Sequence, residues 1–168
     1  KQQAAEIKKL QKQFGDELII LHSSEVEIKA DGSLDYPDDF LASLDIVVAS
    51  LHSSLRQPRE KITERLLQAV NNPHVDIIGH PTGREIPDRE GADLDMEVIL
   101  QAAAKSGVAM EISASPYRLD LDDMHARRAR ELGVLLTINT DAHAEEDYDL
   151  LHYGVAIARR AGVTKNDV

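Results

Sequence analysis

The sequence predicts an α/β fold in which about five parallel strands are flanked by helices on the outside. Short, nearly all-apolar runs alternate along the chain with longer amphipathic segments, as expected for parallel strands that helices cover. The ends of successive apolar runs are separated by about the length of one strand-helix unit. Because a length of 168 residues fits one domain, we expect residues 1–168 to form a single unit.

Five segments are predicted as strands because they are short, apolar and bounded by polar or turn residues. The first is followed by the turn sequence ADGS. The last precedes the polar sequence TDAH. In chain order, the predicted strands are residues 17–28, 45–50, 75–80, 108–113 and 134–139.

The segments around these strands are predicted as helices from apolar residues at helical spacing. The first helix places Ile7, Leu10 and Phe14 at such intervals and ends at Gly15. Pro37 suits the first turn of a short second helix. In chain order, the predicted helices are residues 1–15, 36–44, 59–70, 94–107, 121–133 and 145–162.

The composition excludes several classes of protein. Hydrophobic residues make up 42% of the chain and charged residues 29%, which is typical of a folded, soluble domain. Cysteine is absent, so disulfides and thiolate metal sites are excluded. With no signal peptide and no long apolar run, we expect a cytoplasmic protein without a membrane partner. The net charge of −11 argues against a general basic surface for nucleic acid and favours an acidic site that binds divalent cations.

Polar residues follow the predicted strands where ligands bind in α/β proteins. Glu25, His52, His80, Ser113 and Asp141 stand at or just past the five strand ends, and His143 follows two residues after the last of them. The carboxyl ends of parallel strands meet at one edge, so these side chains should gather there. Carboxylates and imidazoles without sulfur suit Zn, Mn or Fe. We therefore predict Glu25, His52, His80, Asp141 and His143 as metal ligands at a site that hydrolyses phosphoesters.

Each of these residues also has an ordinary structural interpretation. A single histidine after a strand is more often a hydrogen-bonding residue than a ligand, and Asp141 with His143 could be a helix cap and a surface histidine. Five coincident strand ends favour the metal site. The remaining histidines are placed outside it: His22 near the end of the first strand, His74 at the opposite edge, and His125 and His152 within helices.

Other catalytic motifs have little support in the sequence. Phosphate-binding glycine loops are absent, and Ser53 lacks the glycines of a nucleophile elbow. Arg84, close to His80 in GHPTGR, is a candidate for binding a substrate phosphate with its two-pronged guanidinium, although a surface ion pair is an open alternative. We expect Arg84 and Asp141 to be the catalytic residues.

Four segments carry a resemblance to a known family: SSEVEIKADGSLDYPDDFLASLDIVVASLHSSLRQPRE, NNPHVDIIGHPTGR, PYRLDLDDMHARRARELGVLLTINTDAH and GVAIARRAG. Together they resemble the C-terminal polymerase-and-histidinol-phosphatase (PHP) domain of bacterial family X DNA polymerases, over nearly the whole chain. The resemblance implies a distorted (β/α)7 barrel similar to a TIM barrel, with up to three divalent metal ions at its rim. It also implies that Glu25, His52, His80, Asp141 and His143 match ligand positions of the family one by one.

The sequence departs from the family pattern in two ways. The family's domain opens with a His-x-His strand, a later Asp and a further His, and none of these motifs occurs here. We therefore expect the chain to be the C-terminal portion of a PHP domain that by itself binds at most one or two ions weakly and shows little or no nuclease activity. Its open sheet edge could support self-association. The second departure is that Ser113 and Ser115 stand where the family commonly has Asn.

Three functions are consistent with this resemblance. The first is a Mn-dependent 3′–5′ exonuclease that processes DNA 3′ ends in repair, with the polymerase domain of the same protein as its partner. The second is a phosphatase acting on a small monoester such as histidinol phosphate. The third is a non-catalytic module that braces the polymerase. The loop sequences typical of the polymerases favour the first.

Overall fold

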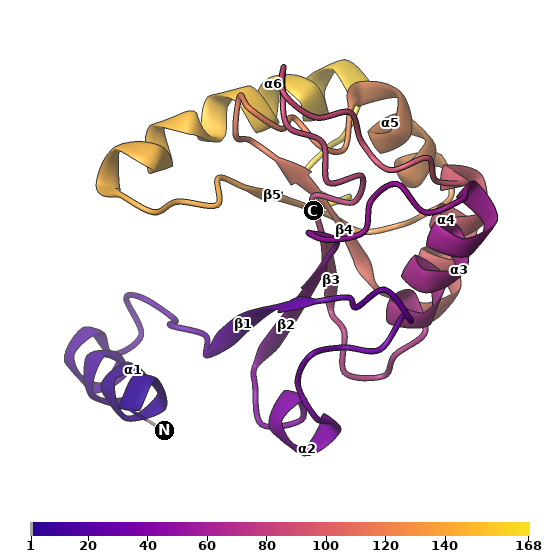
Figure 1. Cartoon of the computed structure of the whole chain (residues 1–168). Helices are drawn as coiled ribbons and strands as arrows, with labels where there is room; N and C mark the ends of the chain where they lie inside the picture. The colour runs from indigo at the N-terminus through magenta and orange to yellow at the C-terminus, as the bar shows by residue number, and fades with distance from the viewer. Residues whose placement is uncertain (1) are drawn as a thin grey trace.

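The computed structural model describes residues 2–168, so Lys1, the first residue of the predicted N-terminal helix, lies outside the described residues. Five strands form one parallel sheet in the order β1-β2-β3-β4-β5 (Figure 1). The prediction of an α/β fold with about five parallel strands is confirmed. Their bounds are β1 Ser23–Glu27, β2 Ile46–Ser50, β3 Ile77–Gly79, β4 Ala109–Ser113 and β5 Leu136–Asn139.

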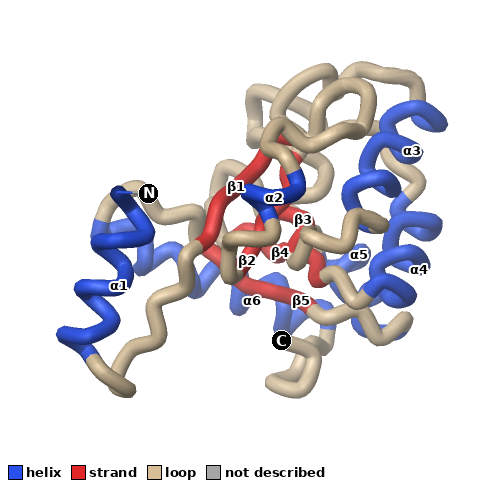
Figure 2. Tube along the Cα trace, turned by 90° about the horizontal axis from the view of Figure 1, so that it is seen from below, coloured by secondary structure: helices blue, strands red, loops and turns tan. Residues whose placement is uncertain are grey.

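Four helices cover one face of this sheet and form the outer wall of a curved layer (Figures 1 and 2). They are α3 Arg59–Val70, α4 Met96–Ser106, α5 Asp123–Glu131 and α6 Leu151–Ala161. The short helix α2 Asp38–Leu41 lies between β1 and β2, and a 3-10 helix, η1 Glu145–Leu150, precedes α6. The N-terminal helix α1 Gln2–Phe14 has no buried residue and stands away from the sheet (Figure 1).

Helix α4 shows how the sequence sets the ends of these elements. The carboxylate of Asp95 accepts a hydrogen bond from the backbone nitrogen of Val98 and caps the first turn. Gly107 ends the helix in the left-handed conformation, with φ of 81°, which costs glycine no side-chain clash. Because both ends are fixed, β4 begins two residues later in register with β3.

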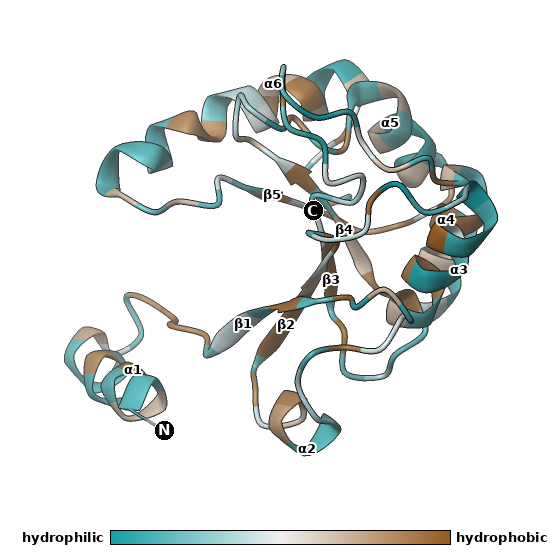
Figure 3. Ribbon diagram, viewed as in Figure 1, coloured by the Kyte–Doolittle hydropathy of each residue, from teal (hydrophilic) through white to brown (hydrophobic). Residues whose placement is uncertain are grey.

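The two faces of the sheet differ in character because successive side chains of a strand point to opposite sides. The helix-covered face is apolar and forms the core, with Val26, Ala49, Ile78 and Met110 all at most 1% exposed. The opposite, inner face carries Glu25 and Glu27 on β1, Ser50 on β2, Glu111 on β4 and Asn139 on β5. Figure 3 shows the hydrophobic stretches concentrated in the strands and in parts of the helices. The fold therefore presents polar groups on one concave face.

Two predicted elements differ from the structure at their ends. The first strand was expected over residues 17–28, but β1 covers only Ser23–Glu27 and Ile19 is 76% exposed. β2 begins at Ile46, opposite Ser23, so earlier residues have no strand to pair with. The final helix was expected from residue 145, but its first part is 3-10, because the Asp147 carboxylate accepts from the backbone nitrogens of His143 and Ala144 and tightens the turn.

Within residues 2–168 the sheet is open, and β1 and β5 are its edge strands. No described helix combines the length and the apolar character that crossing a membrane would need.

Candidate metal centre

Three of the predicted ligands meet on the inner face of the sheet. His52 lies two residues beyond the end of β2, and His80 directly follows β3. Glu25 lies in the middle of β1 rather than at its end, where its side chain points to the same face as that of Glu27. The parallel order β1-β2-β3 therefore brings one carboxylate and two imidazoles together from three consecutive strands.

The geometry of this cluster is that of an ion-binding site. Oε1 of Glu25 lies 3.0 Å from Nε2 of His80 and 3.4 Å from Nε2 of His52. The two imidazole rings are 5.0 Å apart and nearly perpendicular, at 72°. One ligand atom from each of the three residues falls within 4.8 Å of the others. Such a set can converge on one cation with small side-chain adjustments.

The histidines and the carboxylates of the cluster shift one another's pKa values. Hydrogen bonds from His52 and then His80 hold the pKa of the Glu25 carboxyl far below its usual range, against the opposing effect of burial. The same bond to Glu25, with a further one to Glu27, raises the pKa of His52. Glu25 is therefore an anion at every ordinary pH, as a metal-binding carboxylate has to be.

His80 is held at the centre by its backbone. Its side chain is 3% exposed, and its φ of 26° lies in the region that residues other than glycine rarely adopt. The backbone nitrogen donates a hydrogen bond of 2.5 Å to Oε2 of Glu111. The Nδ1 atom is buried and has no hydrogen-bond partner among the described residues. A buried imidazole nitrogen without a partner is uncommon and fits a site that binds a further group.

Glu111 is a residue of the site that the sequence interpretation missed. It lies in the fully buried strand β4, where its Oε1 atom also accepts a hydrogen bond of 2.8 Å from Nδ2 of Asn139. Burial raises the pKa of this carboxyl despite those bonds. The signal was present, because Glu111 is the single charged residue in the apolar run VAMEIS. A charged residue inside a buried strand has to be paired or functional.

The sequence of the chain is similar to sequences of known polymerases and phosphatases. The chain is 48% identical over 167 residues to the DNA polymerase/3′–5′ exonuclease PolX of Bacillus subtilis. The aligned region covers 99% of this chain and 29% of that protein. It is 34% identical over 157 residues to a protein of a Thermoanaerobacter species named as a probable phosphatase, covering 88% of this chain and 62% of that one. No protein-family model matches the chain.

A solved structure shares the fold. The histidinol phosphate phosphatase of Lactococcus lactis, complexed with zinc, L-histidinol and phosphate, superposes with a TM-score of 0.66 at 22% identity, covering 95% of this chain and 73% of that one. The chain resembles the PHP domains of bacterial family X DNA polymerases, and it spans about three tenths of the length of the PolX protein.

The other two predicted ligands, Asp141 and His143, do not belong to the cluster that the structure forms from Glu25, His52 and His80. Asp141 lies two residues beyond β5, with a positive φ of 53° and a side chain that is 40% exposed. The His143 side chain is 82% exposed, and its Nδ1 atom lies 2.7 Å from the backbone oxygen of Asp141. Asp141 lines a groove of about 410 Å³ together with Asn139 and Tyr148. The structure thus places the pair on the same edge, outside the group formed by Glu25, His52 and His80.

The Arg84 side chain forms hydrogen bonds to the loop that follows β4. Its Nε atom donates a hydrogen bond of 2.6 Å to the backbone oxygen of Arg118, and Nη2 donates to that of Leu119. The same two loops are joined by the buried carboxylate of Asp120, which accepts from the backbone nitrogens of Thr82 and Gly83. The loop that carries His80 is therefore fastened to the loop after β4. No hydrogen bond from Nη1 of Arg84 is found within residues 2–168.

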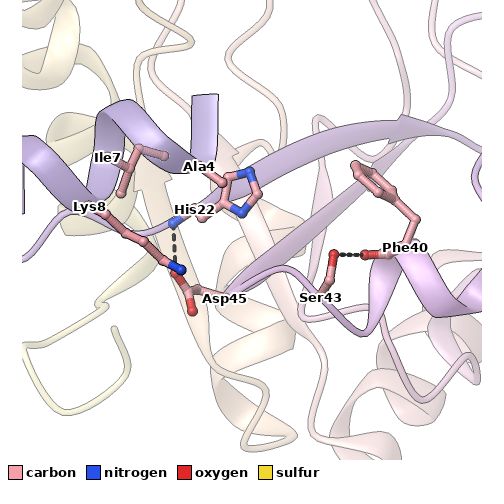
Figure 4. Close-up of a pocket in the computed structure, with 7 residues that line it drawn as sticks. All are labelled: Ala4, Ile7, Lys8, His22, Phe40, Ser43 and Asp45. Carbon is pink, nitrogen blue, oxygen red and sulfur yellow. Dashed lines mark hydrogen bonds between the residues drawn. The ribbon is translucent and has the colours of Figure 1, made fainter. Parts of the chain in front are cut away.

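His22 lies apart from the metal centre, as predicted. Its backbone nitrogen donates a hydrogen bond of 2.8 Å to Oδ2 of Asp45, and its ring lies against helix α1 beside Ala4 (Figure 4). The space between α1 and the region of Phe40 is a pocket of about 400 Å³. His22 lines this pocket and does not belong to the cluster of Glu25, His52 and His80.

Proposed function

We propose that this domain is a metal-dependent phosphoesterase that removes nucleotides from DNA 3′ ends with Mn²⁺. The observation that carries the proposal is the convergence of Glu25, His52 and His80 within 4.8 Å on the inner face of the sheet. The likeness to a protein named as a polymerase and 3′–5′ exonuclease supports the choice of DNA ends as substrate.

The chemistry of the residues fits a divalent ion. Glu25, His52 and His80 would hold the ion through one carboxylate oxygen and two imidazole nitrogens, a donor set that suits Zn²⁺, Mn²⁺ or Fe²⁺. Asp141 and His143 would join them after a rearrangement of the loop beyond β5, in which both side chains are partly or largely exposed. The ion would supply a Lewis acid for the phosphoryl oxygens.

The chain's own residues would bind and orient the substrate around that ion. Arg84 lies on the loop that follows His80, and with two of its nitrogens fixed on backbone oxygens its Nη1 atom remains to contact a phosphate oxygen. Asp141 borders a groove that Tyr148 also lines, and the exposed ring of Tyr148 offers an aromatic surface on which a base could stack. The net charge of −11 favours engagement of a strand end over binding along a duplex.

The test is digestion of an oligonucleotide labelled at its 5′ end by the full-length protein that contains this domain, with Mn²⁺ and without added metal. We expect stepwise shortening from the 3′ end, and loss of at least about 10²-fold in rate for His80→Ala. His74→Ala is the matched control, because His74 precedes β3 at the opposite edge of the sheet and should leave the rate unchanged. Equal rates for His80→Ala and the wild type would contradict the proposal.

A second candidate function is hydrolysis of a small phosphate monoester. Two observations favour it: the 34% identity to a protein named as a probable phosphatase, and the shared fold with a histidinol phosphate phosphatase. Histidinol phosphate and the labelled oligonucleotide, offered to the same preparation, separate the two functions. Cleavage of the monoester alone would favour the phosphatase, and cleavage of neither would favour a non-catalytic module that braces a polymerase domain.

We also propose two partners: a polymerase domain and a second copy of this chain. A polymerase domain would accompany this domain, as in the PolX protein, where the matched region is 29% of the length. Self-association would use the edge of β1, next to the exposed side chains of Leu18, Ile19 and Leu21. Light scattering of the chain over a concentration series tests the second of these.

A further inference from the structure

The carboxylate of Glu27 lies beside the imidazole of His52 and holds its ring. Oε2 of Glu27 is 2.7 Å from Nδ1 of His52 and also accepts from the backbone nitrogen of His52 at 3.1 Å. Oε1 accepts from the hydroxyl of Ser53 at 2.6 Å and from its backbone nitrogen at 3.2 Å. His52 and Ser53, which follow β2, thus both form hydrogen bonds to this one carboxylate through backbone and side chain.

The buried side chain of Arg65 forms an ion pair with Glu27. The Arg65 side chain is 1% exposed, and its Nη2 atom lies 3.3 Å from Oε1 of Glu27. Its other nitrogens donate to the backbone oxygens of Ile28 and Ser53. Arg65 comes from α3, on the other side of β1 and β2, so the position of Glu27 is set by the packing of the helix layer. A buried guanidinium needs such acceptors to offset its desolvation.

These contacts decide which nitrogen of His52 carries the hydrogen. Every neighbour of the Glu27 carboxylate is a donor, so both of its oxygens act as acceptors. The Nδ1 atom of His52 is therefore the donor in the 2.7 Å contact, and its hydrogen is on that side of the ring. The Nε2 atom, on the opposite side, lies farther from its carboxylate, at 3.4 Å from Oε1 of Glu25. In the neutral ring, which carries one hydrogen, the closer contact with Glu27 keeps that hydrogen on Nδ1 and leaves the lone pair of Nε2 for an ion.

We propose that Glu27 is a positioning residue of the metal centre: with Arg65 behind it, it fixes the ring and tautomer of His52 so that Nε2 is presented to the ion. The inference rests on the proposed metal centre and adds to it a residue that does not touch the ion. A histidine ligand that donates its second nitrogen's hydrogen to a carboxylate is both oriented and made more basic.

The two histidines of the centre are held in different ways. The ring of His80 has no hydrogen-bond partner at Nδ1 among the described residues, and its position is set through the backbone contact with Glu111. The side chain of His52 is 42% exposed, and Glu27 makes the shortest contact of its ring, at 2.7 Å from Nδ1. Loss of Glu27 should therefore weaken ion binding through His52 alone.

The test combines two measurements on the metal-free chain labelled with ¹⁵N at histidine, with the ring shifts recorded at a pH above the raised pKa of His52, where the ring is neutral. The ring nitrogen shifts of His52, assigned with His52→Gln, report its tautomer, and calorimetry reports Zn²⁺ affinity. We expect the hydrogen on Nδ1 in the wild type, and Zn²⁺ binding about 10- to 100-fold weaker in Glu27→Gln. Asp35→Asn is the matched control. Among the described residues its carboxylate accepts one hydrogen bond, from the backbone nitrogen of Glu27, so tautomer and affinity should not change.

Several results would overturn the inference. The hydrogen on Nε2 of His52 in the wild type would do so without any variant. A folded Glu27→Gln chain with wild-type Zn²⁺ affinity would do so as well. If Glu27→Gln does not fold, Glu27→Asp replaces it, because it keeps the charge for Arg65 but withdraws the carboxylate by one methylene, and unchanged affinity in that variant contradicts the inference. A wild-type chain that binds no Zn²⁺ contradicts the metal centre, whereas the tautomer still reports on Glu27.

Discussion

The Nε2 atom of His80 lies 3.0 Å from Oε1 of Glu25, although their strands, β3 and β1, are not neighbours in the sheet. The two side chains therefore meet across β2, on the inner face of the sheet. A Cβ atom placed on Gly79 would stand 2.5 Å from Oγ of Ser50 and 2.8 Å from Cγ1 of Val48. The closeness of the two ligands therefore depends on a residue without a side chain just before His80.

Gly79→Ala should destabilise the chain and disturb the centre together. The added methyl group has no space, and such overpacking costs about 1–3 kcal/mol. Urea unfolding measures the loss of stability, and calorimetry measures the accompanying loss of Zn²⁺ affinity. The double variant with Ser50→Ala removes the nearest clash and should recover part of both. Full wild-type stability in Gly79→Ala would show that the inner face is less tightly packed than the structure indicates.

Asp141→Ala and His143→Ala should abolish exonuclease activity without a loss of stability. Both side chains are substantially exposed, at 40% and 82%, so their removal leaves no cavity. Their effect should come from the ion and substrate alone. The comparison needs rates at saturating Mn²⁺ together with thermal unfolding of the same samples. Unchanged rates in both variants would remove them from the site and leave the surface role that the structure gives to His143.

Arg84→Ala should lower turnover by about 10²-fold, the effect of losing one electrostatic donor to the transition state. Because the guanidinium also joins two loops through backbone oxygens, a stability loss of about 1–3 kcal/mol should accompany it. Arg89→Ala is the control, since Arg89 binds the backbone oxygen of Gly83 in the same loop. Metal content should remain unchanged in both. Loss of metal in Arg84→Ala would mean that Arg84 supports the loop and does not bind substrate.

The ion pair of Asp122 and His125 at the start of helix α5 should make the free energy of unfolding depend on pH. A hydrogen bond from His125 lowers the pKa of Asp122 to about 2, and the same bond raises the pKa of His125. The Asp122 contribution is present above the usual pKa of 3.8 and is lost as pH falls through about 2. The His125 contribution is present below 6.5 and is lost as pH rises through its raised pKa.

Unfolding experiments from about pH 2 to pH 9 test this helix start. Asp122→Asn keeps the hydrogen-bonding cap and should flatten the pH dependence by at most about 1 kcal/mol, because both side chains are about one-third exposed. Asp122→Ala should lose the cap as well, about 1 kcal/mol more at every pH. Identical pH profiles for Asp122→Asn and the wild type would exclude the ion pair as a source of stability.

The sequence predicted much of this architecture because its signals are local. Apolar runs and helical spacing gave five strands in a parallel sheet, and the alignment of strand ends brought His52 and His80 together. The length of β1 was overestimated because apolarity alone does not show where a pairing partner begins. Ile19 belongs to the apolar run and yet is 76% exposed.

The supporting residues of the centre could not be predicted as such. Alternation along β1 places Glu25 and Glu27 on the same face, and no local rule tells a ligand from the residue that orients it. Glu111 acts through the backbone of His80, a contact across two strands that depends on register. The convergence of Asp141 and His143 with the other ligands was expected from the alignment of strand ends and from the family resemblance, and their place in the site remains a prediction.

The most direct measurement is a crystal structure of the chain soaked with Zn²⁺, with anomalous scattering recorded at the zinc edge. We expect an anomalous peak on the inner face, about 2.0–2.2 Å from a carboxylate oxygen of Glu25 and from one ring nitrogen each of His52 and His80. A peak bound by other residues, or a saturated soak with no peak between these three side chains, would contradict the metal centre and the phosphoesterase built on it.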